Sequence, residues 1–160
     1  MSKIIFVLRH AQSAGKQGGQ QDYDRVLTPS GEAAARSLGK KLLAGNFNPD
    51  LILASAAVRT KQTAELVNES LRISEQKIHL KKDLYEALMT HWIDTIHLLP
   101  DAENSVLLVG HNPWLSMLAS NFAGNMVELE PCELIGFETA ATSWSEISYA
   151  GKEILRLKNP

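Results

Sequence analysis

The sequence lacks the features that mark several classes of protein. Its 160 residues include one cysteine, Cys132, so no disulfide can form within the chain. The apolar run near the start covers only residues 4–8, too short for a secretion signal or a membrane-spanning helix. These absences argue against a disulfide scaffold and a membrane protein, and they predict a cytoplasmic protein without a membrane partner.

An excess of charge of one sign is also missing. The chain has 16 Lys and Arg against 18 Asp and Glu, which gives a formal net charge of −2. Such a chain has no overall electrostatic attraction to nucleic acids or to anionic membranes. We therefore expect no nucleic-acid partner, and any anion must be bound by a local group of cations.

Two common kinds of catalytic centre have no matching motif. His79, His91 and His97 show no spacing typical of a zinc site, either with one another or with Cys132. The G-x-S-x-G elbow of the serine hydrolases is absent. The sequence thus predicts no metal site and no cofactor.

Strand and helix patterns alternate along most of the chain. Residues 4–8, 51–54 and 106–109 are continuously apolar, which is typical of strands covered on both faces of a parallel sheet. Helical patterns follow or precede these runs, at residues 29–45, 57–71, 91–99 and 114–122. This alternation predicts an α/β fold of three layers, in which a mostly parallel central sheet is flanked by helices.

The remaining segments differ from this pattern. Three stretches near the end read as short strands at an antiparallel edge of the sheet: 134–137, 143–149 and 153–157. Residues 12–24 are rich in glycine and glutamine without helical or strand periodicity, which predicts a loop. No repeat or linker is present, so we expect one domain over residues 1–160.

Candidate functional residues follow the three buried runs. Arg9 and His10 come after the first, Arg59 lies just beyond the second, and His111 follows the third. Because the carboxyl ends of parallel strands meet at one edge of a sheet, these side chains are expected to converge. Guanidinium groups match phosphate oxygens, and nearby cations favour the neutral, nucleophilic form of a histidine. The pattern predicts a phosphate site in which neutral His10 attacks and the arginines and a protonated His111 stabilise the transferred group.

These residues sit in a set of motifs that resembles the histidine phosphatase superfamily. The motif V-L-R-H-A-Q-S at residues 7–13 is similar to the form found in its short SixA-type phosphohistidine phosphatase branch. Further motifs follow in the family's order at residues 24–31, 55–64, 84–87 and 109–113.

The resemblance implies a phosphoglycerate-mutase-like fold and a metal-independent phosphatase. It also implies that His10 is the phosphorylated nucleophile, that Arg9, Arg59, His111 and Arg25 bind phosphate, and that Glu86 acts as a catalytic acid or base. The implied substrate is phosphohistidine on a protein, such as a histidine phosphotransfer domain. Ala11, where the wider superfamily has glycine, favours this branch over the larger mutases.

Two other functions fit parts of the pattern. A phosphatase or mutase of small phosphate esters uses the same residues, although a chain of 160 residues leaves little room for a lid that encloses a metabolite. A phosphate-binding module without catalysis is the second alternative. The presence of all four of Arg9, His10, Arg59 and His111 argues against it.

Overall fold

A six-stranded mixed sheet forms the centre of the computed structural model, which describes residues 1–158. The strands lie in the order β3-β2-β4-β1-β5-β6. The first four in this order run parallel, whereas β5 pairs antiparallel with β1 and β6 antiparallel with β5. The strand bounds are β1 (Ile4–Arg9), β2 (Leu51–Ser55), β3 (Ile78–Lys81), β4 (Ser105–Gly110), β5 (Leu134–Glu138) and β6 (Lys152–Leu157).

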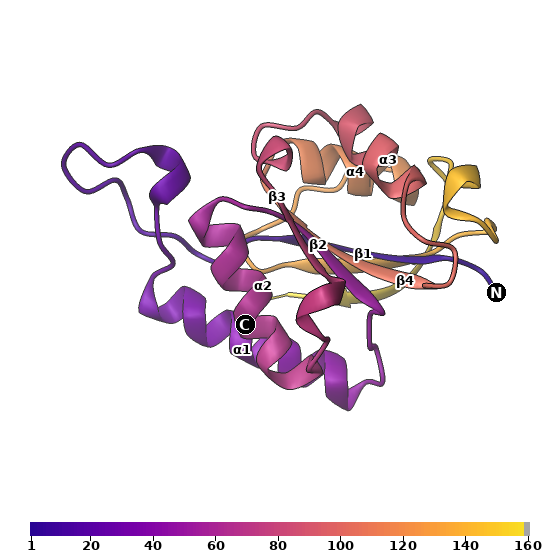
Figure 1. The fold of residues 1–160 in the computed structure, drawn as a ribbon, viewed down its shortest axis with the longest axis horizontal. Coiled ribbons are helices and arrows are strands. Elements are labelled where there is room, and N and C mark those ends of the chain that lie inside the picture. Colours follow the sequence, from indigo (N-terminus) through magenta and orange to yellow (C-terminus); the bar gives the residue numbers. More distant parts are fainter. Residues whose placement is uncertain (159–160) are drawn as a thin grey trace.

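Helices cover both faces of this sheet, as Figure 1 shows. On one face lie α1 (Pro29–Ala44) and α2 (Val58–Leu71), and on the other lie α3 (Met89–His97) and α4 (Trp114–Ala123). The start of α1 follows from its sequence, because Pro29 fits the first turn and the Thr28 hydroxyl accepts a bond of 3.0 Å from the Gly31 N–H. The predicted three-layer α/β fold with a mostly parallel sheet is confirmed.

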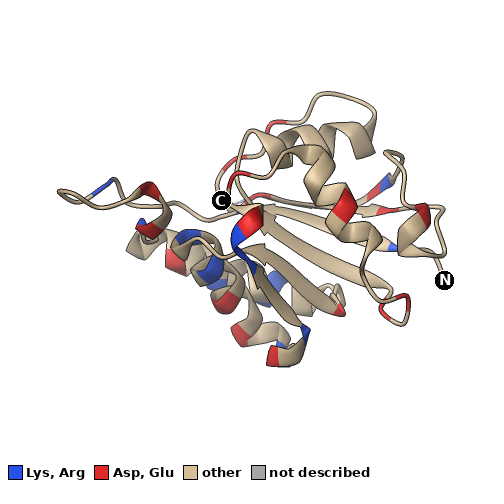
Figure 2. Cartoon of the chain, turned by 45° about the horizontal axis from the view of Figure 1, so that its top comes forward, with Lys and Arg blue, Asp and Glu red and all other residues tan. Residues whose placement is uncertain are grey.

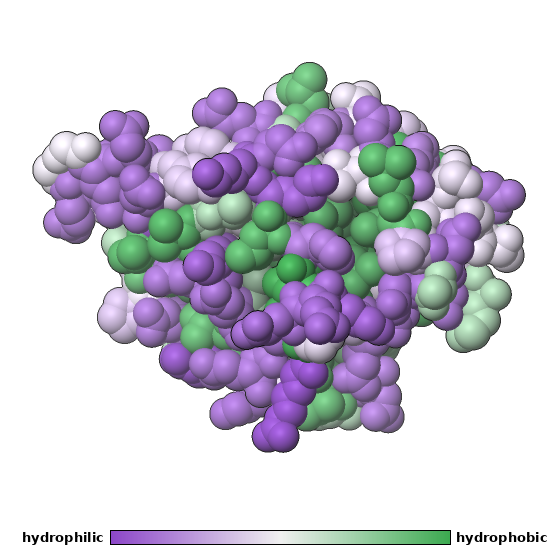
Figure 3. All heavy atoms as spheres, viewed as in Figure 1, coloured by the Kyte–Doolittle hydropathy of each residue, from purple (hydrophilic) through white to green (hydrophobic). Residues whose placement is uncertain are grey.

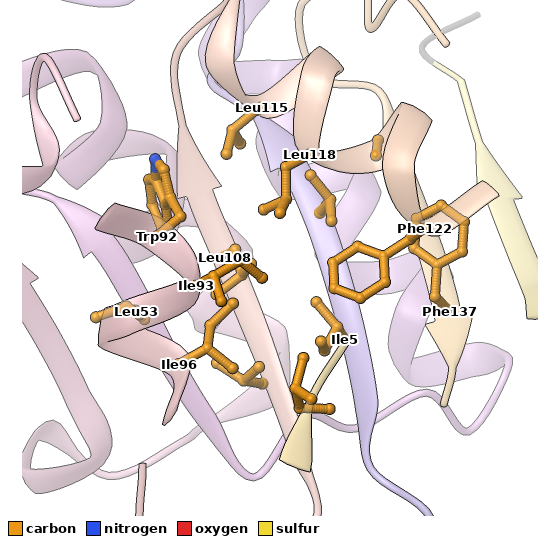
Figure 4. Packing of buried hydrophobic residues seen from close by; sticks show 14 of the residues in the cluster. Ile5, Leu53, Trp92, Ile93, Ile96, Leu108, Leu115, Leu118, Phe122 and Phe137 are labelled. Carbon is orange, nitrogen blue, oxygen red and sulfur yellow. The ribbon is translucent and has the colours of Figure 1, made fainter. Parts of the chain in front are cut away.

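The two faces of the sheet bury separate apolar clusters. Along β1, Ile5 and Val7 point to the cluster under α3 and α4, while Phe6 and Leu8 point to the cluster under α1 and α2. Figure 4 shows the first cluster, in which side chains of α3 and α4 pack on those of the strands. Because alternate residues of each central strand are buried on opposite faces, the strands read as continuous apolar runs.

One expectation for the sheet was wrong, and one strand was missed. Residues 143–149, expected to form a strand, contain a 3-10 turn at Trp144–Glu146. The turn is fixed by Trp144, whose backbone N–H donates to Asp101 Oδ1 at 2.8 Å and whose indole N–H donates to the Glu103 carbonyl at 2.9 Å. The edge strand β3 was not predicted, since its four residues are half-buried or exposed and lack an apolar run.

The helix and loop bounds agree with expectation apart from small shifts. The helix expected at residues 91–99 begins two residues earlier, at Met89, and ends at His97. Residues 12–24 form the predicted loop except for a 3-10 turn at Asp22–Asp24. In Figures 1 and 3 this segment projects from the left of the molecule, and its surface is largely hydrophilic.

The surface carries charges of both signs. Basic and acidic residues are interspersed over α1 and α2, as Figure 2 shows, in line with the small net charge. Among the described residues, no helix combines the length and the apolar character that crossing a membrane requires.

The contact between α1 and α2 leads to a prediction about stability. A Cβ at Gly39 would overlap the Val67 carbonyl oxygen and lie 3.1 Å from the Val67 carbonyl carbon. We expect Gly39→Ala to lower the free energy of unfolding by about 1–3 kcal/mol, although alanine favours helices, because the two helices must move apart. Urea unfolding tests this, with Lys40→Ala at the exposed neighbouring position as a control that stays within about 0.5 kcal/mol of the unmodified protein. A stabilised Gly39→Ala variant would contradict the packing argument.

Candidate active site

Two histidines meet at the carboxyl ends of the parallel strands. His10 directly follows β1 and His111 directly follows β4, and these strands are neighbours in the sheet. The centroids of the two imidazole rings lie 5.4 Å apart. The convergence expected from the sequence is therefore present, at the edge of the sheet where α/β folds bind ligands.

The contacts of His10 indicate which ring nitrogen is free to react. Its Nδ1 lies 2.7 Å from the Ala11 carbonyl oxygen, an acceptor, so Nδ1 carries the proton and Nε2 has the lone pair. Burial lowers the pKa of His10 to about 4, with smaller contributions from Arg59, Arg9 and Arg25. His10 is therefore neutral near pH 7, as expected, but burial contributes more to this than the arginines do.

His111 is also neutral, which corrects the expectation of a protonated side chain. Burial lowers its pKa to about 3, with further lowering by Arg59 and His10. Its Nε2 lies 2.9 Å from the hydroxyl oxygen of Ser55, the last residue of β2. Its Nδ1 is buried and has no hydrogen-bond partner in the described part of the chain. If the Ser55 hydroxyl donates to Nε2, Nδ1 carries a hydrogen that is available to a bound anion.

Arg9 and Arg59 share one feature that suits an anion site. The Nη1 of Arg9 donates to the Leu129 carbonyl at 3.0 Å, and the Arg59 guanidinium donates to Asp22 through Nη1 at 2.7 Å and Nη2 at 3.0 Å. In both side chains Nε is buried and has no hydrogen-bond partner among residues 1–158. Because buried donors are nearly always paired in native proteins, these two N–H groups indicate an acceptor supplied by a ligand.

Arg25 has a different set of contacts. Its guanidinium donates to the Ala14 carbonyl at 2.8 Å, to Asp22 Oδ1 at 3.0 Å and to the Ser13 hydroxyl at 2.9 Å. All three of its nitrogens are thus bonded within the segment around residues 12–25. The charge of Arg25 lies near enough to His10 to lower the pKa of His10. The hydrogen bonds of Arg25 itself are made within the loop.

Glu86 lies at the opening of the site. Its side chain is exposed and lines a cavity of about 330 Å³. The other lining residues are Asp22, Arg59, Tyr85, His111, Asn112 and Trp114. Trp114 borders this opening, whereas Trp92 and Trp144 are buried in the core.

A larger and more apolar cavity of about 740 Å³ adjoins the first, and the two share Asn112. It runs along α4 and is bordered by Met117 and Met126, which are both exposed. Arg59, Glu86 and His111 line the smaller cavity and not the larger one, so we place the chemistry beside the smaller cavity. Within residues 1–158, no three side chains of His, Cys, Asp or Glu are grouped as a metal site would require.

Three residues of the site were not assigned a role from the sequence. These residues are Asp22, Ser55 and Tyr85. In the structure the Tyr85 hydroxyl donates to Asp22 Oδ2, and its ring packs edge-on against His111 with centroids 5.4 Å apart. The only sequence feature that pointed to Tyr85 was its position next to Glu86. The loop that carries Asp22 has no periodicity, so the position of Asp22 in the fold could not be inferred from the sequence.

Comparisons with known proteins bear on the family and on the fold of the chain. The family model of the histidine phosphatase superfamily (branch 1) matches residues 5–96, more than half of the chain. Over 70 residues the chain is 42% identical to the mitochondrial serine/threonine-protein phosphatase PGAM5 of Xenopus tropicalis, a match that covers 44% of this chain and 24% of that protein.

Solved structures that share the whole fold include two SixA proteins. One, assigned as the phosphohistidine phosphatase SixA of Agrobacterium tumefaciens, has a TM-score of 0.84 and 24% identity, and the match covers 99% of both chains. The other, the protein histidine phosphatase SixA complexed with tungstate, has a TM-score of 0.82 and 19% identity, and the match covers 98% of this chain and 97% of that one.

Proposed function

The chain belongs to the histidine phosphatase superfamily, and from this premise we propose that it removes phosphate from phosphohistidine on a protein, through a phosphohistidine formed at its own His10. One observation carries the proposal. A buried, neutral His10 lies beside two arginines, and within the described residues neither its Nε2 nor the buried Nε–H groups of the arginines have a hydrogen-bond partner. A nucleophile and an unfilled set of anion donors are what phosphoryl transfer requires.

In the first step of this mechanism, His10 Nε2 attacks the phosphorus atom. An N–P bond forms at His10 while the bond from phosphorus to the leaving group breaks. The Nε–H groups of Arg9 and Arg59 stabilise the charge on the equatorial oxygens. His111 adds its Nδ1–H in the tautomer whose Nε2 accepts from the Ser55 hydroxyl. When the leaving group is an imidazole, it departs easily once its nitrogen is protonated, so a strong acid is not needed.

In the second step, water attacks the phosphorus of phosphorylated His10. The bond between phosphorus and Nε2 breaks, inorganic phosphate leaves, and His10 returns to the neutral form that its burial favours. We assign the proton transfers to Glu86, as acid in the first step or base in the second, because its exposed carboxyl borders the cavity that contains Arg59 and His111. Neither step calls for a metal ion.

The shape of the site supports a phosphoryl group presented on the surface of a protein. The small cavity opens beside the larger groove along α4, and no additional domain encloses it among the described residues. A histidine phosphotransfer domain is a partner of this kind. We also propose a cytoplasmic location, since the one thiol, Cys132, is buried and unpaired.

A phosphatase of small phosphate esters is the second candidate. The likeness to PGAM5, a serine/threonine-protein phosphatase, favours phosphate esters over phosphohistidine, although the match covers less than half of this chain. The third candidate, a binding module without turnover, is disfavoured because His10 is both neutral and free at Nε2.

A substrate comparison with a chelator separates these functions. With EDTA present, we expect kcat/KM for a phosphohistidine-bearing phosphotransfer domain to exceed that for sugar phosphates or serine phosphopeptides by at least about a hundredfold, because an imidazole leaves more easily than an alkoxide. Release of inorganic phosphate provides the measurement. Preference for an ester would establish the second candidate, phosphate binding without release the third, and loss of activity with EDTA would show a metal enzyme.

A further inference from the structure

Asp22 contacts several residues of the site, and not only Arg25, its ion-pair partner within the loop. Its Oδ2 accepts a bond of 3.0 Å from Arg59 and a short bond from the Tyr85 hydroxyl, while its Oδ1 accepts a bond of 3.0 Å from Arg25. Its backbone carbonyl accepts a second bond from Arg59, at 2.7 Å. Both carboxylate oxygens and the carbonyl are therefore occupied by site side chains from three separate segments.

The contacts on Arg59 fix the orientation of its guanidinium group. Asp22 engages Nη1 and Nη2, the two nitrogens at the end of the fork. The side of the group that carries Nε remains unpartnered, and the side chain is only 7% exposed. A guanidinium held at its end in this way can still offer Nε and the second hydrogen of Nη2 to two oxygens of one phosphoryl group.

The loop that carries Asp22 is itself held at its base. Ser13 and Leu27 form a β-bridge, and the Ala14 N–H donates to the Val26 carbonyl at 2.8 Å. The Arg25 side chain adds hydrogen bonds to the Ala14 carbonyl and the Ser13 hydroxyl. The backbone on both sides of Asp22 is thereby tied down, so its carboxylate can act as a fixed support.

We propose that Asp22 is a positioning residue of the phosphate site, which holds Arg59 at the end of its guanidinium so that the Nε side faces the phosphoryl group. The inference rests on the proposed function, because it assumes that the anion bound beside Arg59 is a phosphoryl group. Asp22 does not contact the reacting atoms. It acts through Arg59, and Tyr85 and Arg25 hold it in place.

If Asp22 instead competed with the phosphoryl group for Arg59, its replacement would have the opposite effect on phosphate binding. If its carboxylate occupied the place of the phosphoryl group, it would compete with phosphate, and removing its charge would tighten phosphate binding. Coulomb interactions alone also predict tighter binding after removal of a negative charge near an anion site. Weaker binding would therefore demonstrate positioning, since no electrostatic effect of the substitution gives that sign.

The test is Asp22→Asn, which keeps the size of the side chain but replaces one acceptor oxygen with a donor. We expect the dissociation constant of inorganic phosphate, measured by calorimetry without substrate, to rise about tenfold, and KM to rise in parallel with a smaller change in kcat. Asp24→Asn, an exposed residue of the same turn, is the matched control and should bind phosphate as the unmodified protein does. Unchanged or tighter binding in Asp22→Asn would overturn the proposal.

A second variant keeps the test decisive if Asp22→Asn unfolds. Tyr85→Phe removes only the hydroxyl that donates to Asp22, and we expect phosphate binding to weaken about threefold at an unchanged melting temperature. Binding at the unmodified level or tighter would count against the proposal. Because phosphate binding is measured without turnover, these results do not depend on which phosphorylated substrate the enzyme uses. A shift in phosphate affinity in a protein without phosphatase activity would leave the role of Asp22 standing and reject the proposed function.

Discussion

Asparagine in place of His10 is expected to reduce phosphatase turnover by at least about 10⁴-fold, to the background rate. Loss of an enzyme's nucleophile has effects of this size. The asparagine side-chain NH₂ can replace Nδ1–H as the donor to the Ala11 carbonyl, while no atom replaces the Nε2 lone pair. The variant thus removes the proposed nucleophile with little change in its local hydrogen bonding. Steady-state release of inorganic phosphate measures the loss.

The matched control for this prediction is His79→Ala. His79 is exposed on the edge strand β3, away from the strand ends that form the site, and its loss should leave turnover unchanged. Circular dichroism and thermal melting of His10→Asn establish that the fold is kept. Turnover above about a tenth of the unmodified rate in a folded His10→Asn protein would exclude His10 as the nucleophile.

Lysine in place of Arg59 is expected to reduce kcat/KM by about 10²–10³-fold although it keeps the positive charge. A single ammonium group cannot donate to two phosphoryl oxygens while also replacing both bonds of the guanidinium to Asp22. Losses of this size follow the removal of one donor from a preorganised site for transition-state charge. The effect is measured with the phosphohistidine substrate at low concentration.

Arg36→Lys serves as the control for Arg59→Lys. Arg36 is 46% exposed on α1, where it pairs with Glu32 and Glu69, and we expect its replacement to change neither activity nor melting temperature appreciably. A loss in Arg59→Lys of less than about threefold would mean that charge alone is enough at this position, and the bidentate role of Arg59 would be wrong.

The sequence predicted the centre of the sheet because the central strands are buried on both faces. Runs such as residues 4–8 have no polar face, and this pattern fits few other structures. The edge strand β3 has no such run, so its pairing with β2 could be seen only in the structure. Residues 143–149 resemble a strand by composition, but the bonds of Trp144 to residues 101 and 103, far away in the sequence, decide its conformation.

The part of the candidate site that lies at the strand ends was predictable, and the part that lies in a loop was not. His10, His111 and Arg59 lie at or just beyond the ends of predicted strands, and parallel topology brings such residues together. The role of Asp22 depends on how a loop without periodicity folds back on α2, which no local pattern encodes. The protonation of His111 was predicted from its expected role, whereas its burial and the neighbouring arginines determine its pKa.

The phosphorylated intermediate provides the most direct test of the central claim, that His10 carries the phosphoryl group. The enzyme is mixed with ³²P-labelled substrate, quenched within milliseconds, and mapped by mass spectrometry under conditions that preserve phosphohistidine. We predict a label that is lost in acid, resists alkali and lies on Nε2 of His10. Label on a serine or a carboxylate, or full turnover with no labelled enzyme, would contradict the mechanism.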